Sequence, residues 1–174
     1  VVRRQVELHH RPVGEREPEL GERHPGRDDL DPVHRAERVL AWRLDRIARD
    51  FVRHYAEGWE SGKAMFVCID KPTCVRMHGL IEKYWTEHIH TLTAQNASET
   101  DDQALAERSR QLKWMGETRF AVMVSEEQGE VDRFRRLGLD IQPHRRLIKE
   151  GWSVPGAPKP LSMEDAFKKA DHPF

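Results

Sequence analysis

The sequence has few of the residues that would cross-link it or carry it into a membrane. Only two of its 174 residues are cysteines, Cys68 and Cys74, which are too few for the disulfide framework of a small secreted domain. It contains no apolar stretch of the roughly 18 residues that a membrane-spanning helix needs. We also find no signal peptide and no lipidation motif. These absences predict a cytoplasmic protein with two reduced, buried thiols.

An excess of charge of one sign is also lacking. The chain carries 29 basic and 30 acidic residues, for a formal net charge of -1. The overall charge therefore gives no argument for a nucleic-acid partner, and any contact with DNA has to come from a local basic patch. Because 34% of the residues are charged and 37% are hydrophobic, we expect a core from only part of the chain.

Regular periodicity is missing from residues 1–43. This segment mixes proline, glycine, arginine, glutamate and histidine, and its apolar residues repeat with neither a helical nor a strand period. One interpretation is a disordered tail. The other is a shifted reading frame in GC-rich DNA, which produces text of this kind. In either case we expect no function from the segment, and we place a boundary between residues 43 and 44.

Periodic patterns after this boundary predict helices that alternate with strands. Apolar residues between 44 and 55 share one helical face, and Gly58 follows as a stop signal. The continuous apolar run 64–69 predicts a strand buried on both faces. Pro72 then fits the first turn of a helix. Helix, buried strand and helix in this order form one unit of an α/β fold.

The second part of the chain predicts the same alternation. We expect a helix over 98–116, a second buried strand over 120–124 and a helix over 126–138, followed by a short basic helix and a last helix that Ser162 begins with a capping box. The expected fold class is α/β, with parallel buried strands flanked by helices. Two strands are few for a parallel sheet, so we expect the sheet to be incomplete and the chain to be a fragment.

Ser61-Gly62-Lys63 looks like part of a phosphate-binding loop but fails as one. The loop requires a glycine five residues before Gly62 and a serine or threonine after the lysine. Glu57 and Ala64 occupy these two positions. The tripeptide therefore predicts a turn.

The sequence also contains no convincing metal-binding or catalytic pattern. His88 and His90 lie two residues apart, so on a helix they point in different directions and do not converge on one ion. His78 and Glu82 have the right i,i+4 spacing, but two ligands alone make no site. We predict no catalytic residue, no metal site and no cofactor for this chain.

Two features leave alternatives open. Cys74 near a helix N-terminus is either a thiol with a lowered pKa or, as we favour, a small packing residue. The basic residues Arg145, Arg146 and Lys149, together with the arginines at 133, 135 and 136, either contact phosphates or form a solvated helix face.

Four blocks of the sequence resemble the motor (R) subunit of type I restriction endonucleases. The blocks are 62–77, 122–131, 139–150 and 166–174, and they occur in the family's order. The first looks like the opening of the second motor lobe, and the second resembles the next strand and helix of that lobe. The last is similar to the text before the following helicase motif. One block alone is a weak signal, whereas four in order are specific.

The resemblance implies a superfamily 2 helicase-like motor in which two RecA-like lobes clamp ATP and pump double-stranded DNA, with a separate nuclease domain. Residues 44–174 would be an incomplete second lobe. The implied partners are double-stranded DNA and the methylation and specificity subunits, and the family's cofactors are ATP and Mg²⁺. Matching positions suggest contacts with the DNA backbone or the lobe cleft for Asp70, Lys71, Thr73, Arg76 and Ser125.

The sequence also departs from the family. The phosphate-binding loop, the Asp-Glu magnesium motif, the arginine motif of the second lobe and the nuclease carboxylates have no counterpart, so nothing here orients a phosphoryl group. We therefore expect a fragment of an ATP-dependent DNA-translocating motor subunit that is inactive alone. The alternative is a small standalone DNA-binding or antirestriction module that resembles the motor lobe. An unrelated α/β domain fits the ordered blocks poorly.

Overall fold

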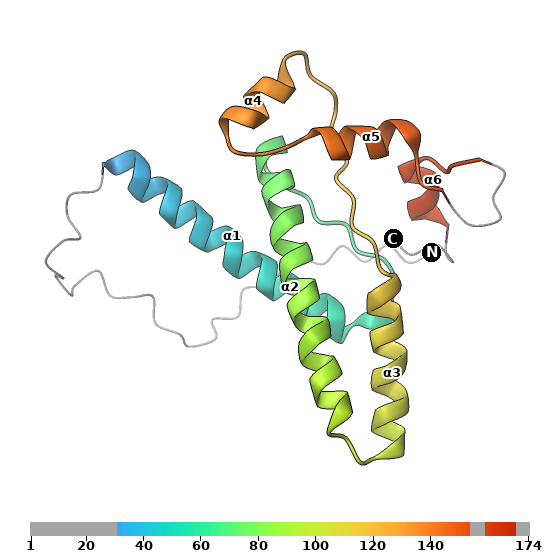
Figure 1. Ribbon diagram of the computed structural model, residues 1–174. Coiled ribbons are helices and arrows are strands. Elements are labelled where there is room, and N and C mark those ends of the chain that lie inside the picture. The colour runs from blue at the N-terminus through green and yellow to red at the C-terminus, as the bar shows by residue number, and fades with distance from the viewer. Residues whose placement is uncertain (1–30, 154–158, 170–174) are drawn as a thin grey trace, which may run out of the picture.

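A computed structural model describes residues 31–153 and 159–169, and this part of the chain is all-α (Figure 1). Its elements are α1 (Pro32–Glu57), the 3-10 helix η1 (Trp59–Ser61), α2 (Lys71–Ala97), α3 (Asp102–Glu117), α4 (Glu130–Arg136), α5 (Gln142–Glu150) and α6 (Met163–Lys168). The tail was predicted over residues 1–43; residues 1–30 of it lie outside the described residues, and residues 32–43 belong to helix α1. The boundary that we placed between residues 43 and 44 falls inside α1.

The predicted α/β fold is wrong, because neither expected strand forms among the described residues. Residues 62–68 and 118–127 are extended but have no strand partner. Residues 64–69 were expected to be buried on both faces. Instead, Phe66 and Cys68 pack against the helices, whereas Met65, Val67 and Ile69 are 73%, 82% and 94% exposed. A strand needs a hydrogen-bonding neighbour as well as an apolar pattern, and here one face packs on helices without such a neighbour.

Helices α1, α2 and α3 pack together around the larger of the two hydrophobic cores found among the described residues. Pro32 stands in the first turn of α1, and the side chain of Asp31 accepts a hydrogen bond from the Val33 amide at 3.3 Å. The predicted stop at Gly58 is confirmed. The first core consists of nine buried residues: Leu44, Ala48, Val52, Ala56, Met77, Ile81, Tyr84, Trp85 and Met115. Its four α1 residues are spaced by four, which places them on one stripe of that helix.

Aromatic side chains fill the centre of this first core. Trp85 is 4% exposed, and its ring lies 5.7, 5.5 and 5.1 Å from those of Tyr55, Trp114 and Phe120. The indole Nε1–H of Trp85 donates to the carbonyl oxygen of Met115 at 3.0 Å. This bond satisfies the one polar group that the buried ring carries, so α2 and α3 are joined by packing and by a hydrogen bond.

A second, smaller core joins the start of α2 to α4 and to the residues just before α5. It consists of Val75, Val122, Phe134 and Ile141. Val122 belongs to the extended segment 118–127, so that segment supplies side chains to this core. In Figure 1, α4 and α5 lie at the end of the molecule where α2 begins. This end holds most of the residues that sequence reasoning singled out.

Local signals placed several helix ends correctly. Pro72 lies in the first turn of α2, as predicted. The hydroxyl of Ser162 accepts from the Asp165 amide at 3.1 Å, which confirms the capping box of α6. Ser98 was expected to begin α3, but it is the C-cap of α2, and Asp101 caps α3 instead.

Lys63, which follows Gly62, stabilises the C-terminal end of α6. Gly62 has a φ of 100°, a value that glycine adopts readily. Nζ of Lys63 donates to the carbonyl oxygens of Ala166 at 3.0 Å and Phe167 at 3.1 Å, and also to that of Lys169. A cation at this position is favourable because the carbonyls at a helix C-terminus carry partial negative charge. Lys63 therefore has a structural role at the end of α6.

Gly151 ends α5 where the chain approaches the residues before α6. The amide of Trp152 donates to the carbonyl oxygen of Leu161 at 2.7 Å, and the reverse bond measures 2.8 Å. Gly151 has a φ of 74°, and a Cβ there would clash with the carbonyl oxygen of Leu161. Glycine is required at this position on both grounds.

We expect Gly151→Ala to lower the free energy of unfolding by about 2 kcal/mol, because it adds strain at positive φ and a clash with backbone. Gly79→Ala is the matched control. Gly79 is in α2, and a Cβ there meets nothing within 4 Å, so alanine is expected to add up to about 1 kcal/mol through its higher helix propensity. Urea unfolding followed by circular dichroism measures both. Equal effects of the two variants on the free energy of unfolding would contradict the requirement for glycine at position 151.

Candidate functional site

Asp70 and Thr73, two of the predicted contact residues, form the N-terminal cap of α2. Asp70 Oδ1 accepts from the Thr73 amide at 2.7 Å. Hydrogen bonds from the side chain and the amide of Thr73 lower the pKa of Asp70, with a smaller contribution from the charges of Arg76 and Arg133. Thr73 is 8% exposed, and its amide donates to the cap. Both residues therefore serve the helix, and Arg76, a third predicted contact residue, is half-buried.

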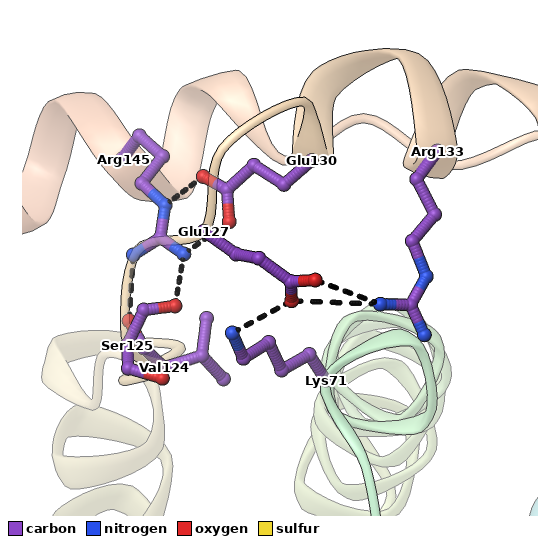
Figure 2. Close-up of polar contacts among 7 residues, drawn as sticks. All are labelled: Lys71, Val124, Ser125, Glu127, Glu130, Arg133 and Arg145. Carbon is purple, nitrogen blue, oxygen red and sulfur yellow. Dashed lines mark hydrogen bonds and ion pairs between the residues drawn. The ribbon is translucent and has the colours of Figure 1, made fainter.

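Lys71 joins α2 to the turn before α4. Its Nζ lies 3.1 Å from Oε2 of Glu127, and Nη1 of Arg133 lies 3.4 Å from Oε1 of the same carboxylate. Figure 2 shows the Glu127 carboxylate between the two cations. Side-chain exposures of 26%, 48% and 52% for Lys71, Glu127 and Arg133 leave this group open to water. The two pairs therefore contribute little to stability.

Arg145, by contrast, is directed into the protein. From α5, its Nη1 donates to the carbonyl oxygen of Val124 and its Nη2 to that of Ser125, both at 2.6 Å. Its Nε and Nη2 also bond the two carboxylate oxygens of Glu130, the latter at 2.6 Å, as Figure 2 shows. The side chain of Arg145 is 17% exposed. Its donors hold the extended segment 118–127 and α4 against α5.

The pairing with Arg145 explains how the fold accommodates a buried carboxylate at Glu130, a residue only 5% exposed. The hydrogen bonds from Arg145 lower the pKa of Glu130, against the opposing effect of burial. Glu130 in turn raises the pKa of Arg145. A bidentate arrangement of this kind is the strongest that the two groups make. We call Lys71, Glu127, Glu130, Arg133 and Arg145 the charged cluster.

Beside the charged cluster lies an open hollow of about 590 Å³. Arg146 and Lys149 on α5 are exposed residues on its lining, and Ser125 lies at its edge on the extended segment. Glu126 and Glu150 also line it, so the hollow carries charges of both signs. The exposed cations Arg146 and Lys149 are the groups in the hollow that could bind phosphate oxygens. The structure thus brings Ser125, Arg146 and Lys149 together, and places Lys71 at the neighbouring cluster.

His78, which was weighed as a metal ligand together with Glu82, makes polar contacts to Glu82 and Phe120. His78 Nδ1 lies 3.3 Å from Oε2 of Glu82, and His78 Nε2 lies 3.3 Å from the carbonyl oxygen of Phe120. Its ring also packs edge-on against that of His144, with a centroid distance of 4.8 Å. Burial, and then His78, lower the pKa of His144. Within residues 31–153 and 159–169, no group of three potential ligands gathers around a metal position.

Sequence reasoning missed Glu127 and Glu130 as members of a site. Both lie in the segment 126–138, for which the sequence predicted only a helix. Their partners are 56 residues away in the case of Lys71 and 15 residues away in the case of Arg145. Pairs at these separations leave no periodic trace in a sequence, and no local signal marks Glu130 as buried.

Comparisons with protein-family models, with curated proteins and with solved structures returned no match to this chain. In the part of the chain that the structure describes, no helix has both the length and the apolar character needed to cross a bilayer.

Proposed function

We propose that this chain is part of the motor subunit of a type I restriction endonuclease, where it supplies a DNA-contacting surface and does not hydrolyse ATP by itself. The observation that carries the proposal is the meeting of three resembling blocks at the charged cluster. Lys71 comes from the first block, Glu127 and Glu130 from the second, and Arg145 from the third. Three segments that resemble the same family and also contact one another are expected to form one folded part of the motor subunit.

The surface that this unit presents supports a contact with the nucleic-acid backbone. Arg145 is occupied by Glu130 and by two backbone carbonyls, so its role is to hold the segment that carries Ser125. The next residue, Arg146, and Lys149 one turn later are exposed beside that segment. Two outward cations at i,i+3 lie on one side of a helix, a spacing suited to phosphates of one strand.

The outward apolar residues Met65, Val67 and Ile69 support the proposal that the chain belongs to a larger body. They are 73%, 82% and 94% exposed, and they alternate with half-buried residues along the same extended segment. Large side chains of this kind, gathered on one face, are usually covered by another protein surface. We infer that the rest of the motor subunit packs against Met65, Val67 and Ile69.

The lack of ATP-binding motifs supports the proposal that the chain does not hydrolyse ATP by itself. The 174 residues contain no phosphate-binding loop and no Asp-Glu magnesium motif. The side chain of Lys63 bonds the end of α6. Phosphoryl transfer needs both a cradle for the phosphates and a metal carboxylate, so ATP turnover in the assembled motor would depend on other parts of the subunit.

A standalone DNA-binding or antirestriction module remains the second candidate. It is favoured by the two packed cores that the described residues form without a sheet. The two candidates differ in their partners. A part of the motor subunit is expected to associate with the rest of that subunit, whereas a standalone module is expected to unfold cooperatively and bind DNA alone.

The double variant Arg146→Glu/Lys149→Glu tests the proposed surface. Removing two phosphate contacts is expected to weaken binding to duplex DNA by roughly ten-fold or more at 0.1 M salt, and to reduce the slope of log K against log[salt] by about 2. The loss should be similar for DNA duplexes of unrelated sequence, because backbone contacts carry no sequence information. Fluorescence anisotropy with labelled duplexes measures both quantities.

Arg35→Glu/Arg38→Glu is the matched control. These two arginines have the same i,i+3 spacing and are exposed on α1, so the charge change is the same at a different surface. We expect this control to leave most of the DNA affinity in place. An equal loss in both double variants, or DNA-stimulated ATP turnover by the purified chain, would contradict the proposal.

A further inference from the structure

The carboxylate of Glu127 marks a position where two cations from different helices converge. Nζ of Lys71, at the start of α2, lies 3.1 Å from Oε2 of this carboxylate. Nη1 of Arg133, on α4, lies 3.4 Å from Oε1 and 3.5 Å from Oε2. In Figure 2 the two cationic side chains reach the carboxylate from different sides. Lys71 and Arg133 are therefore already placed to hold one anionic group between them.

The carboxylate that fills this position in the free chain can be displaced. The side chains of Lys71, Glu127 and Arg133 are 26%, 48% and 52% exposed, and ion pairs that are this open to water contribute little to stability. Glu130, the other carboxylate of the charged cluster, is 5% exposed and is held by Arg145. An incoming anion would therefore exchange with Glu127 and not with Glu130.

The position between the two cations adjoins the hollow that carries Arg146 and Lys149. Glu127 directly follows Glu126, which lines the hollow, and Arg145 belongs both to the lining and to the charged cluster. Each strand of a DNA duplex carries one phosphate for about every 3.4 Å of helix axis. A strand bound in the hollow therefore presents further phosphates to the neighbouring cations.

We propose that Lys71 and Arg133 form a second phosphate-binding position for the DNA backbone, which the carboxylate of Glu127 occupies while DNA is absent. This inference rests on the proposed contact with DNA. When DNA binds, a backbone phosphate replaces the carboxylate, and the side chain of Glu127 turns to solvent. Glu127 thereby lowers the affinity for DNA, because its two ion pairs must break before Lys71 and Arg133 can contact a phosphate.

Glu127→Gln tests this competition in the whole chain. Glutamine keeps the shape of the side chain but removes its charge, so the affinity for a labelled DNA duplex is expected to rise about five-fold at 0.1 M salt. Glu126→Gln is the matched control, because it removes the same charge from the exposed residue next to it. We expect this control to raise the affinity by less than about two-fold, since it releases neither Lys71 nor Arg133. Fluorescence anisotropy measures the affinities, and the midpoint of urea unfolding should be the same for both variants.

The double variant Lys71→Met/Arg133→Met separates the proposed exchange from general repulsion between Glu127 and DNA. If the two cations receive the phosphate, adding Glu127→Gln to this double variant should no longer raise the affinity. A gain of the same size with and without the two cations, or equal gains from Glu127→Gln and Glu126→Gln, would overturn this inference while leaving the proposed DNA surface in place. Failure of the unmodified chain to bind duplex DNA would instead contradict the proposed function, and this inference with it.

Discussion

Arg145→Met is expected to lower the free energy of unfolding by about 3 kcal/mol, because it leaves the buried carboxylate of Glu130 without its partner. Glu130 is 5% exposed, and Arg145 contributes four hydrogen bonds to this region, two of them to the backbone of Val124 and Ser125. Methionine keeps much of the aliphatic length but removes every donor. Urea unfolding at neutral pH measures the loss.

Arg135→Met provides the comparison for an exposed pair. Arg135 bonds Asp132 at 3.0 Å, but the two side chains are 73% and 76% exposed, so we expect a change within about 0.5 kcal/mol. A similar loss in both variants would contradict the special role given to Arg145. The double variant Glu130→Gln/Arg145→Met should recover part of the loss, because no unpaired charge remains buried.

The same pair predicts how stability depends on pH. The pKa of Glu130 is lowered in the folded chain by Arg145, so folding favours the ionised carboxylate. Its contribution is complete above the ordinary glutamate pKa of about 4.3 and is lost as the pH falls through the lowered folded value. The difference in unfolding free energy between the unmodified chain and Arg145→Met should therefore shrink below about pH 4. A difference that stays constant as the pH falls below about 4 would contradict the ion pair between Glu130 and Arg145.

Trp85→Ala is the second variant with a large expected effect, a loss of about 4 kcal/mol. The substitution removes a side chain that is 4% exposed. It also removes three ring contacts and the hydrogen bond to Met115. The cavity lies where α1, α2 and α3 meet, so the helices cannot close it without moving together. Thermal unfolding followed by circular dichroism measures the lowered Tm.

Trp42→Ala removes the same side chain from an exposed position. Trp42 is 45% exposed on α1 and stacks under Arg46 at 5.1 Å, a contact worth about 0.5–1 kcal/mol at an exposed site. We therefore expect a loss below about 1 kcal/mol. A Trp85→Ala variant no less stable than Trp42→Ala would show that the first core is not organised around this aromatic ring.

The helices were predictable because their signals are local. Pro72 in a first turn, Gly58 as a stop and Ser162 as a cap each act within about one helical turn, and all three are confirmed. The start of α3 was wrong by a few residues because Ser98 and Asp101 both suit a cap. Asp101 accepts from the Gln103 amide at 2.8 Å, and Ser98 instead bonds the end of α2.

The strands were wrong because an apolar run does not specify its neighbours. The side chains of residues 64–69 alternate between the helices and solvent, as extended backbone requires. Whether such a segment becomes a strand depends on a second segment at hydrogen-bonding distance. Among the described residues, helices pack against one face of segment 64–69. The apolar residues of this segment do not determine whether a second strand lies beside its backbone.

The candidate site was predictable only in part, for a related reason. Lys71 and Ser125 were chosen from resembling blocks and Arg146 from a run of basic residues, and the structure places Ser125 and Arg146 on the lining of one hollow. The inward role of Arg145 depends on Glu130, and the role of Lys71 depends on Glu127. Such ion pairs are set by tertiary packing, which brings together residues that have no fixed spacing in the sequence.

The central claim, that this chain is part of a type I restriction motor subunit, is tested most directly by sequencing the genomic DNA on both sides of its coding sequence and translating it in all three frames. The account predicts codons for a phosphate-binding loop and an Asp-Glu magnesium motif upstream, and codons for the arginine motif of the motor downstream. Unrelated, intact genes on both sides would contradict the account.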